Sequence, residues 1–82
     1  MSLHLDIVTP DAHVYQGEVE SATFPGSLGT FQVLIDHAPI ISALTKGTLV
    51  YVNADGTHSL EIDGGVVEVL KNNITVLAES IA

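Results

Sequence analysis

Apolar and polar residues alternate along most of the chain, and this alternation is the strongest indication of its secondary structure. Residues two apart point to the same face of a strand, so a period of two is typical of half-buried strands, whereas an amphipathic helix needs a period near 3.6. Leu3, Leu5 and Ile7, for example, are separated by single polar residues. The pattern predicts strands at residues 3–7, 14–15, 18–24, 30–35, 48–53, 58–62, 66–70 and 74–78.

Turn-forming residues separate these strands. Asn53-Ala54-Asp55-Gly56 predicts one hairpin turn and Asn72-Asn73 another, because Asn, Asp and Gly tolerate positive φ. We expect Gly26 and Gly64 to hold angles that are closed to other residues. Residues 40–45 are ambiguous, since three of them would share a helix face. Their Thr and Ile residues favour a strand, and the segment is short for a helix.

About eight to ten short strands, spaced about 8–12 residues apart with turns between them, are typical of an antiparallel sandwich or barrel. The 82 residues form a single domain, residues 1–82. We therefore expect an all-β fold, a flattened antiparallel β-sandwich with one core layer between its two sheets. The residues predicted to fill that layer are Leu5, Ile7, Phe24, Phe31, Val33, Leu60, Ile62, Val67, Val69 and Val76.

Charged residues are scarce and mostly acidic, with 2 Lys+Arg against 10 Asp+Glu and a net charge of −8. Nucleic-acid binding rests on Lys and Arg that neutralise phosphates, so this composition excludes it and disfavours an anionic membrane surface. No apolar run reaches the roughly 18 residues of a membrane-spanning helix, so we expect no direct membrane insertion. Cysteine is absent, which excludes a disulfide framework and a thiol nucleophile.

No group of residues has the spacing of a catalytic or metal site. The histidines, none of which forms a close pair, are His4, His13, His37 and His58. Two carboxylate pairs share a strand face, namely Glu18 with Glu20 and Glu61 with Asp63. Their apolar neighbours turn these faces to water rather than into a cleft. Gly26-Ser27-Leu28-Gly29 lacks the Gly-Lys-Ser/Thr end of a P-loop, and no Ser lies in a nucleophile elbow. We expect no catalytic residue, metal, cofactor or small-molecule substrate.

Apolar residues on both faces of some strands are typical of one part of a larger assembly. Tyr15, Val19 and Val50 are the candidates for contact with other subunits.

Several segments, taken in order along the chain, are similar to those of one known family. These segments are residues 4–10, 14–19, 24–29, 37–44, 64–69 and 73–78. Together they resemble the epsilon subunit of F-type ATP synthases over nearly the whole chain.

The resemblance implies a function within a rotary complex. The family's N-terminal domain is a flattened ten-stranded sandwich at the foot of the central stalk. It binds the gamma subunit, rests on the polar loops of the membrane rotor ring and catalyses nothing. The resemblance thus implies a peripheral membrane complex on the cytoplasmic face of a bacterial inner membrane, which couples proton flow to ATP synthesis. The family usually carries a C-terminal helical hairpin that inhibits ATP hydrolysis. Because this chain ends where that hairpin would begin, we expect the inhibitory function to be missing.

Two segments match the edge of the family's domain that faces the ring and gamma. The candidate contact residues at these positions are Ser27, Leu28, Thr30, Phe31, Asp36 and His37. The chain departs from the family there. Thr30 stands where an acidic residue is common, Gln32 where Gly is common, and Ile35-Asp36 where Pro-Gly or Pro-Asn precedes the His. We hypothesise that Asp36 supplies the lost acidic contact to a cationic ring loop.

Two other classes of protein stay open on the residues alone. One is a free-standing β-sandwich that binds a sugar or a small acid, which should be monomeric with an enclosed pocket. The other is a small metal-dependent enzyme of the cupin kind, which would need clustered His and Glu ligands on its strands. A stalk subunit should instead have a filled interior and an apolar outer patch.

Overall fold

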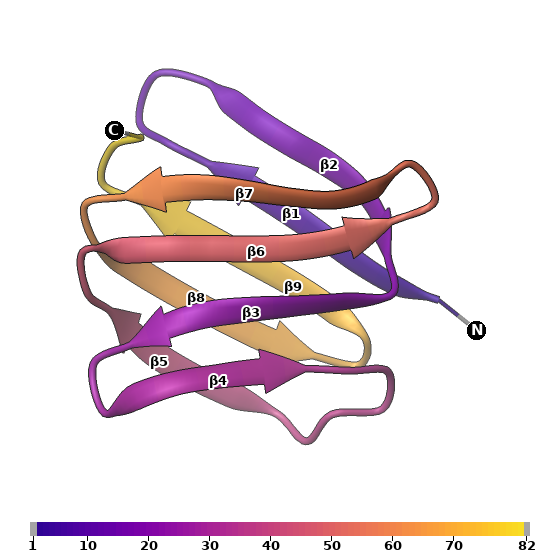
Figure 1. Cartoon of the computed structure of the whole chain (residues 1–82). Coiled ribbons are helices and arrows are strands. Elements are labelled where there is room, and N and C mark those ends of the chain that lie inside the picture. Colours follow the sequence, from indigo (N-terminus) through magenta and orange to yellow (C-terminus); the bar gives the residue numbers. More distant parts are fainter. Residues whose placement is uncertain (1, 82) are drawn as a thin grey trace.

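The computed structural model describes residues 2–81, and these residues form nine strands and no helix (Figure 1). The predicted all-β fold is confirmed. The strands are β1 Leu3–Val8, β2 His13–Val19, β3 Ser21–Gly26, β4 Gly29–Val33, β5 Ile40–Leu44, β6 Gly47–Asn53, β7 Gly56–Ile62, β8 Gly65–Leu70 and β9 Asn73–Ala78. The ambiguous segment at 40–45 is thus a strand, as its Thr and Ile content favoured.

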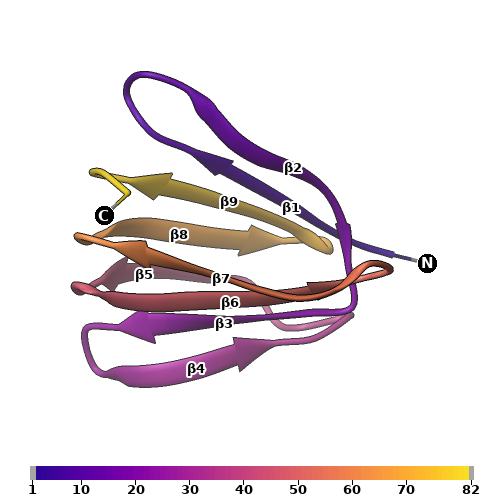
Figure 2. The same cartoon turned by 45° about the horizontal axis from the view of Figure 1, so that its top comes forward.

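The strands form two layers that face each other (Figures 1 and 2). One layer has the order β2-β1-β9-β8-β5, and the other has β4-β3-β6-β7. A single pair, Gly26 with Leu44, joins β3 to β5, so the two layers are one curled sheet that is closed on this side. The pairing is antiparallel throughout the named strands except between β1 and β9, which run parallel.

The predicted strand at 18–24 is wrong in its extent, because the chain changes layers within it. Val19 is the last residue of β2 and pairs with Leu3, whereas Ser21 begins β3 and pairs with Val52 in the opposite layer. Glu20 forms the corner between the two sheets. Continuous alternation of residue type in the sequence does not reveal such a corner, since each half is regular.

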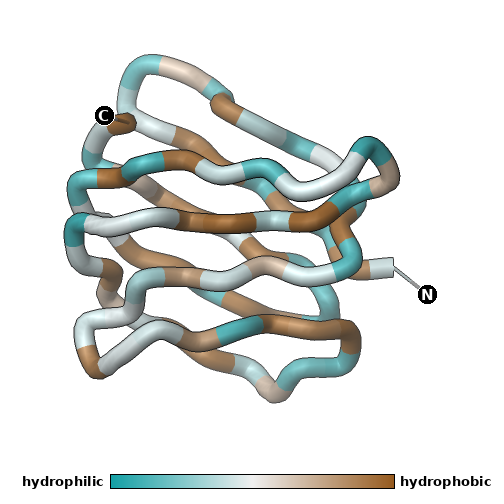
Figure 3. The backbone as a smooth tube through the Cα atoms, in the orientation of Figure 1, coloured by the Kyte–Doolittle hydropathy of each residue, from teal (hydrophilic) through white to brown (hydrophobic). Residues whose placement is uncertain are grey.

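Hydrophobic and hydrophilic residues alternate along the strands (Figure 3). The buried hydrophobic residues form one core cluster. Eight of the ten predicted core residues are buried: Leu5, Ile7, Phe24, Val33, Ile62, Val67, Val69 and Val76. Phe31 and Leu60 are only half-buried against this core. They lie on β4 and β7, which are edge strands, so a neighbouring strand covers them from one side only. The buried residues that the sequence reasoning missed are Leu3, Val19, Ala22, Leu44, Leu49, Tyr51, Ile74 and Ala78.

Aromatic residues close the side of the sandwich opposite the β3–β5 junction. Tyr15 on β2 packs on Tyr51 of β6 with ring centroids 4.5 Å apart, and His58 of β7 stacks on Tyr51 with ring centroids 5.1 Å apart. Asn53 connects Tyr15 and His58, since its Nδ2 donates to the Tyr15 hydroxyl and its Oδ1 lies 3.1 Å from Nε2 of His58. Burial, and secondarily the Tyr15 hydroxyl, raises the pKa of Tyr51 above its ordinary value.

Gly64 and Gly26 are required for different reasons, one for its backbone angle and the other for the space that it leaves. Gly64 has φ of 123°, as predicted. The same prediction is wrong for Gly26, which is not among the residues with positive φ. A Cβ on Gly26 would lie 2.6 Å from the carbonyl oxygen of Gly29 and 2.9 Å from the Phe31 ring. Because Gly26 has no Cβ, Gly29 and the Phe31 ring of β4 can approach it closely. Gly26 is therefore needed for space and not for an unusual backbone angle.

The two predicted hairpins are present, one of them with shifted central residues. Asn53 ends β6 and Gly56 begins β7, as expected. In the β8–β9 hairpin the residues with positive φ are Lys71 and Asn72, at 50° and 63°. Asn73 already belongs to β9. The turn thus uses Lys71 where the sequence favoured a second Asn, because the register between β8 and β9 places the turn one residue earlier.

Candidate partner-binding edge and apolar face

Five of the six candidate contact residues lie at or beyond the two ends of β4, the edge strand at the bottom of Figure 1, and Phe31 lies in its middle. Ser27 and Leu28 form the turn between β3 and β4, and Thr30 follows in β4. Asp36 and His37 lie in the loop that connects β4 to β5, at the opposite end of the strand. The fold thus spreads these residues along one edge and does not gather them at one point.

The β3–β4 turn presents an apolar side chain on a firmly held backbone. Leu28 is fully exposed. The N–H of Ser27 donates to the Ala43 carbonyl at 3.0 Å, and the N–H of Thr45 donates to the Pro25 carbonyl at 2.9 Å. These bonds tie the turn to the end of β5, so Leu28 projects from a fixed position. Such an exposed leucine is suited to contact with a partner protein.

Phe31 has a different place from its neighbours in this group. Its ring lies 5.5 Å from that of Phe24, centroid to centroid, at an interplanar angle of 38°. Because Phe24 is fully buried, Phe31 faces the interior and supports the edge strand from inside. Thr30, its neighbour in the chain, is exposed.

The β4–β5 loop turns sharply at Asp36, whose φ is 63°. The N–H of His37 donates to the Leu34 carbonyl at 3.2 Å and closes the turn. Two further hydrogen bonds join Asp36 to Asn72 in the β8–β9 hairpin. Asp is one of the few residues that accept positive φ at low cost, which gives a local reason for its position here.

A second surface lies on the outer face of the layer β5-β8-β9, and we call it the apolar face. It consists of four exposed hydrophobic residues: Ile41, Val66, Leu70 and Leu77. Val66 pairs with Leu77 across β8 and β9, while Ile41 on β5 pairs with Glu68. Ile41 is 73% exposed and Leu77 is 55% exposed, and exposed hydrophobic residues that are grouped on one face are typical of a contact surface.

The sequence reasoning missed the apolar face and chose Tyr15, Val19 and Val50 instead. Val19 is buried, so its choice as a surface residue is wrong: it faces inward at the end of β2. Tyr15 and Val50 are half-buried. A signal for the apolar face is present in the adjacent residues Val66-Val67 and in Leu77 between two inward-facing residues, since neighbours in a strand point to opposite faces.

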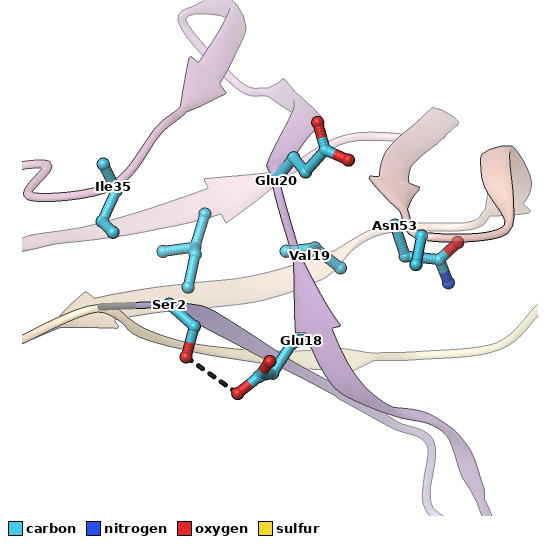
Figure 4. Close-up of a pocket in the computed structure, with 8 residues that line it drawn as sticks. Ser2, Glu18, Val19, Glu20, Ile35 and Asn53 are labelled. Carbon is cyan, nitrogen blue, oxygen red and sulfur yellow. Dashed lines mark hydrogen bonds between the residues drawn. The ribbon is translucent and has the colours of Figure 1, made fainter.

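A pocket of about 380 Å³ lies where the start of β1, the β2–β3 corner, the end of β6 and the β4–β5 loop meet (Figure 4). Ser2 donates a hydrogen bond to Glu18 at 2.9 Å. Glu18 and Glu20 lie on opposite sides of Val19, with their carboxylates directed away from each other (Figure 4). The pocket therefore offers no paired carboxylates for acid–base chemistry.

The other polar groups of residues 2–81 are spread over the surface. Both carboxylate pairs noted in the sequence are exposed, as expected. His13 lies 3.6 Å from Asp6, and within the described part of the chain no three His, Cys, Asp or Glu side chains form a group that could hold a metal ion. Residues 2–81 also include no helix with the length and apolar character needed to cross a bilayer.

Comparison with known families decides the relationship of this chain. Residues 2–82 match the model of the ATP synthase delta/epsilon chain β-sandwich domain. The chain belongs to this family. The resemblance seen in the sequence is confirmed, and the nine strands of the structure lie within the predicted range of eight to ten.

Relatives with the name ATP synthase epsilon chain are similar to nearly the whole chain. One from Nitratidesulfovibrio vulgaris (strain DP4) is 48% identical over 79 residues, which are 96% of this chain and 59% of the relative. Another from Anaeromyxobacter sp. (strain Fw109-5) is 39% identical over 80 residues, which are 98% of this chain and 61% of the relative. The chain thus spans about three fifths of the length of these family members.

Solved structures share the fold. A chain of the Euglena gracilis mitochondrial ATP synthase (OSCP/F1/c-ring) has a TM-score of 0.91 at 20% identity, over 99% of this chain and 52% of that one. A chain of the Tetrahymena thermophila mitochondrial ATP synthase (central stalk/c-ring) has a TM-score of 0.83 at 13% identity, over 100% of this chain and 66% of that one. These two chains therefore share the fold of residues 2–81 at low sequence identity.

Proposed function

We propose that this chain is the β-sandwich part of a non-catalytic epsilon subunit in the central stalk of a proton-translocating F-type ATP synthase. It joins the gamma subunit to the membrane rotor ring and turns with them. The observation that carries the proposal is the match, over 96% of the chain, to relatives named ATP synthase epsilon chain. The implied location is a peripheral complex on the cytoplasmic face of a bacterial inner membrane.

The apolar face is the surface that we assign to gamma. Its four large hydrophobic residues lie outside a core that is already closed, so they contribute nothing to the packing of this domain. A partner that covers them stabilises the complex by about 25 cal/mol for each Å² of apolar surface removed from water. A permanent neighbour in a stalk is the kind of partner that keeps such a face covered.

The edge along β4 is the surface that we assign to the rotor ring. The net charge of −8 favours basic partners, and the exposed Asp36 lies at one end of this edge while the exposed Leu28 lies at the other. An apolar anchor together with an acidic group suits a polar, cationic loop. Ser27, Thr30 and His37 complete this contact in our proposal.

Replacing Asp36 with Lys tests the charge at this edge. We expect the affinity for the purified rotor ring to fall roughly tenfold at low salt, because a like charge then faces the cationic loop, and the difference to shrink as salt screens it. The measurement is a binding titration at several salt concentrations. The matched control is Asp11→Lys, which makes the same change at an exposed site in the β1–β2 connection. Equal affinity of the Asp36 variant and the original chain at every salt concentration would end the assignment.

Replacing Ile41 with Ser tests the apolar face. We expect the affinity for purified gamma to fall roughly tenfold, since Ile41 is the most exposed residue of the apolar face and an interface hot spot contributes more than about 1 kcal/mol. Val50→Ser is the control, because Val50 lies on the outside of the opposite layer. A loss of gamma binding with the Val50 variant and not with the Ile41 variant would move the interface to the other layer.

Co-purification with gamma and ring subunits of the same source tests the function as a whole. We expect a stable complex that contains one copy of this chain and of gamma on the ring. A chain that binds neither purified partner, or that holds a small molecule in the pocket beside β1, would favour the ligand-binding alternative instead.

A further inference from the structure

Asn72, at the tip of the β8–β9 hairpin, holds the loop that carries Asp36 and His37. The backbone N–H of Asp36 donates to Oδ1 of Asn72 at 2.6 Å. In return, Nδ2 of Asn72 donates to Oδ1 of Asp36 at 3.2 Å. The two residues are 36 positions apart in the sequence, so this reciprocal pair is a tertiary contact and not part of a local turn.

The hairpin tip is itself fixed from the other side. The carbonyl of Asn72 accepts a hydrogen bond from the N–H of His4 at 2.8 Å, which ties it to the start of β1. Lys71 and Asn72 both hold positive φ, as the two central residues of a tight hairpin do. Asn72 is thus a rigid anchor that contacts the β4–β5 loop with its side chain and β1 with its backbone.

The loop has little else to hold it. Apart from the strand ladders, the two bonds to Asn72 are the only hydrogen bonds within residues 2–81 that join residues 34–38 to another element. The remaining bonds, from the His37 N–H to Leu34 and between Nδ1 of His37 and the Ala38 carbonyl, are internal to the loop. The conformation of Asp36 therefore depends on Asn72.

We propose that Asn72 is a positioning residue that directs the Asp36 carboxylate toward the rotor ring. This inference rests on the proposed function. Asn72 occupies Oδ1 of Asp36 and leaves Oδ2 for a cationic group of the partner. A carboxylate that is already fixed loses less conformational entropy on binding than a free one, and its charge lies at a defined place. The specificity of the edge for a cationic loop thus depends on a residue from a different hairpin.

Two substitutions separate the position of the carboxylate from its charge. Asn72→Gly removes both hydrogen bonds while glycine keeps the positive φ, and the net charge stays the same. Asp36→Asn keeps the pair, because an Asn at this position still offers its backbone N–H and an acceptor oxygen, but it removes the charge. Asn73→Gly is the matched control, since it is the same substitution one residue away and the Asn73 side chain donates to the Lys71 carbonyl and not to Asp36.

Each variant is titrated against purified rotor ring and, separately, against purified gamma, at several salt concentrations. We expect Asn72→Gly to weaken ring binding roughly fivefold to tenfold, the effect of one or two net hydrogen bonds, with an unchanged salt dependence and unchanged gamma affinity. Hydrogen exchange of the Asp36 amide should become faster in this variant. Asp36→Asn should weaken ring binding and flatten its salt dependence, while the Asp36 amide stays protected.

Three results would overturn the inference. Ring affinity of Asn72→Gly equal to that of the original chain or of Asn73→Gly, with Asp36→Asn weakened, would remove the role of Asn72 and leave the proposed edge in place. Equal weakening toward gamma and the ring would indicate a general loss of structure. Undiminished ring binding by Asp36→Asn would overturn both this inference and the role of Asp36 on which it rests.

Discussion

Replacing Phe24 with alanine should lower the free energy of unfolding by about 3–5 kcal/mol, the usual effect of removing a fully buried aromatic ring. Phe24 is 0% exposed and is the largest of the fully buried side chains. It lies in β3 beside the ring of Phe31, its cross-strand partner in β4, and belongs to the core cluster between the layers. Domains of this size are stable by only about 5–15 kcal/mol, so we expect a large shift of the urea midpoint in a circular-dichroism titration.

Phe31→Ala is the matched control, since it removes the same ring from the adjacent edge strand. Phe31 is half-buried, so water reaches part of the space that its ring leaves and the strand can relax. We expect a loss of about half that of Phe24→Ala. Equal losses would mean that β4 is covered on its outer side, for example by self-association, which measurement at several protein concentrations would reveal.

Strand positions could be predicted from the sequence wherever one face alone is buried. Leu5 and Ile7 in β1 and Val67 and Val69 in β8 alternate with less buried residues, and the structure buries all four. The period of two survives because each of these strands has one face against the same core. The ambiguous segment that became β5 was resolved by residue type alone.

The predictions that failed depend on pairing between distant residues. The corner at Glu20 is set by the pairing of Val19 with Leu3, 16 residues away, and of Ser21 with Val52, 31 residues away. The alternation of apolar and polar residues within each strand is the same whichever strand it pairs with, so it does not reveal the corner. Gly26 was interpreted through its own backbone angle, but its role comes from the approach of Gly29 and Phe31. Both errors arise because contacts across the sheet decide what a residue does.

In the candidate site, too, features that depend on local sequence could be predicted, and features that depend on contacts between distant residues could not. Asp36 could be singled out because it lies close in the sequence to Thr30, which stands where the family often has an acidic residue, in a chain whose net charge suits basic partners. Asn72 could not, because its relation to Asp36 exists only when the β8–β9 hairpin meets the β4–β5 loop. The apolar face lies between these two cases: adjacent apolar residues in β8 were visible, but which side faced outward required the register of β5, β8 and β9.

Gly65→Ala is the second substitution for which we expect a large loss, about 4 kcal/mol or more of the free energy of unfolding. Gly65 begins β8 with φ of 146°. A Cβ built there would lie 2.2 Å from the Leu77 carbonyl oxygen and 2.9 Å from the Ala78 Cα. Both atoms belong to the backbone of β9, so the strands would have to separate where β8 also pairs with β5.

Gly56→Ala separates the clash from the backbone strain. Gly56 has φ of 123°, yet nothing lies within 4 Å of a Cβ at this position. Its substitution therefore costs only the unfavourable backbone conformation, about 1–3 kcal/mol. Thermal unfolding of the two variants under the same conditions should show the Gly65 variant well below the Gly56 variant. Similar losses for both would mean that β8 and β9 move apart easily, and that the apolar face across these two strands is less rigid than a permanent interface requires.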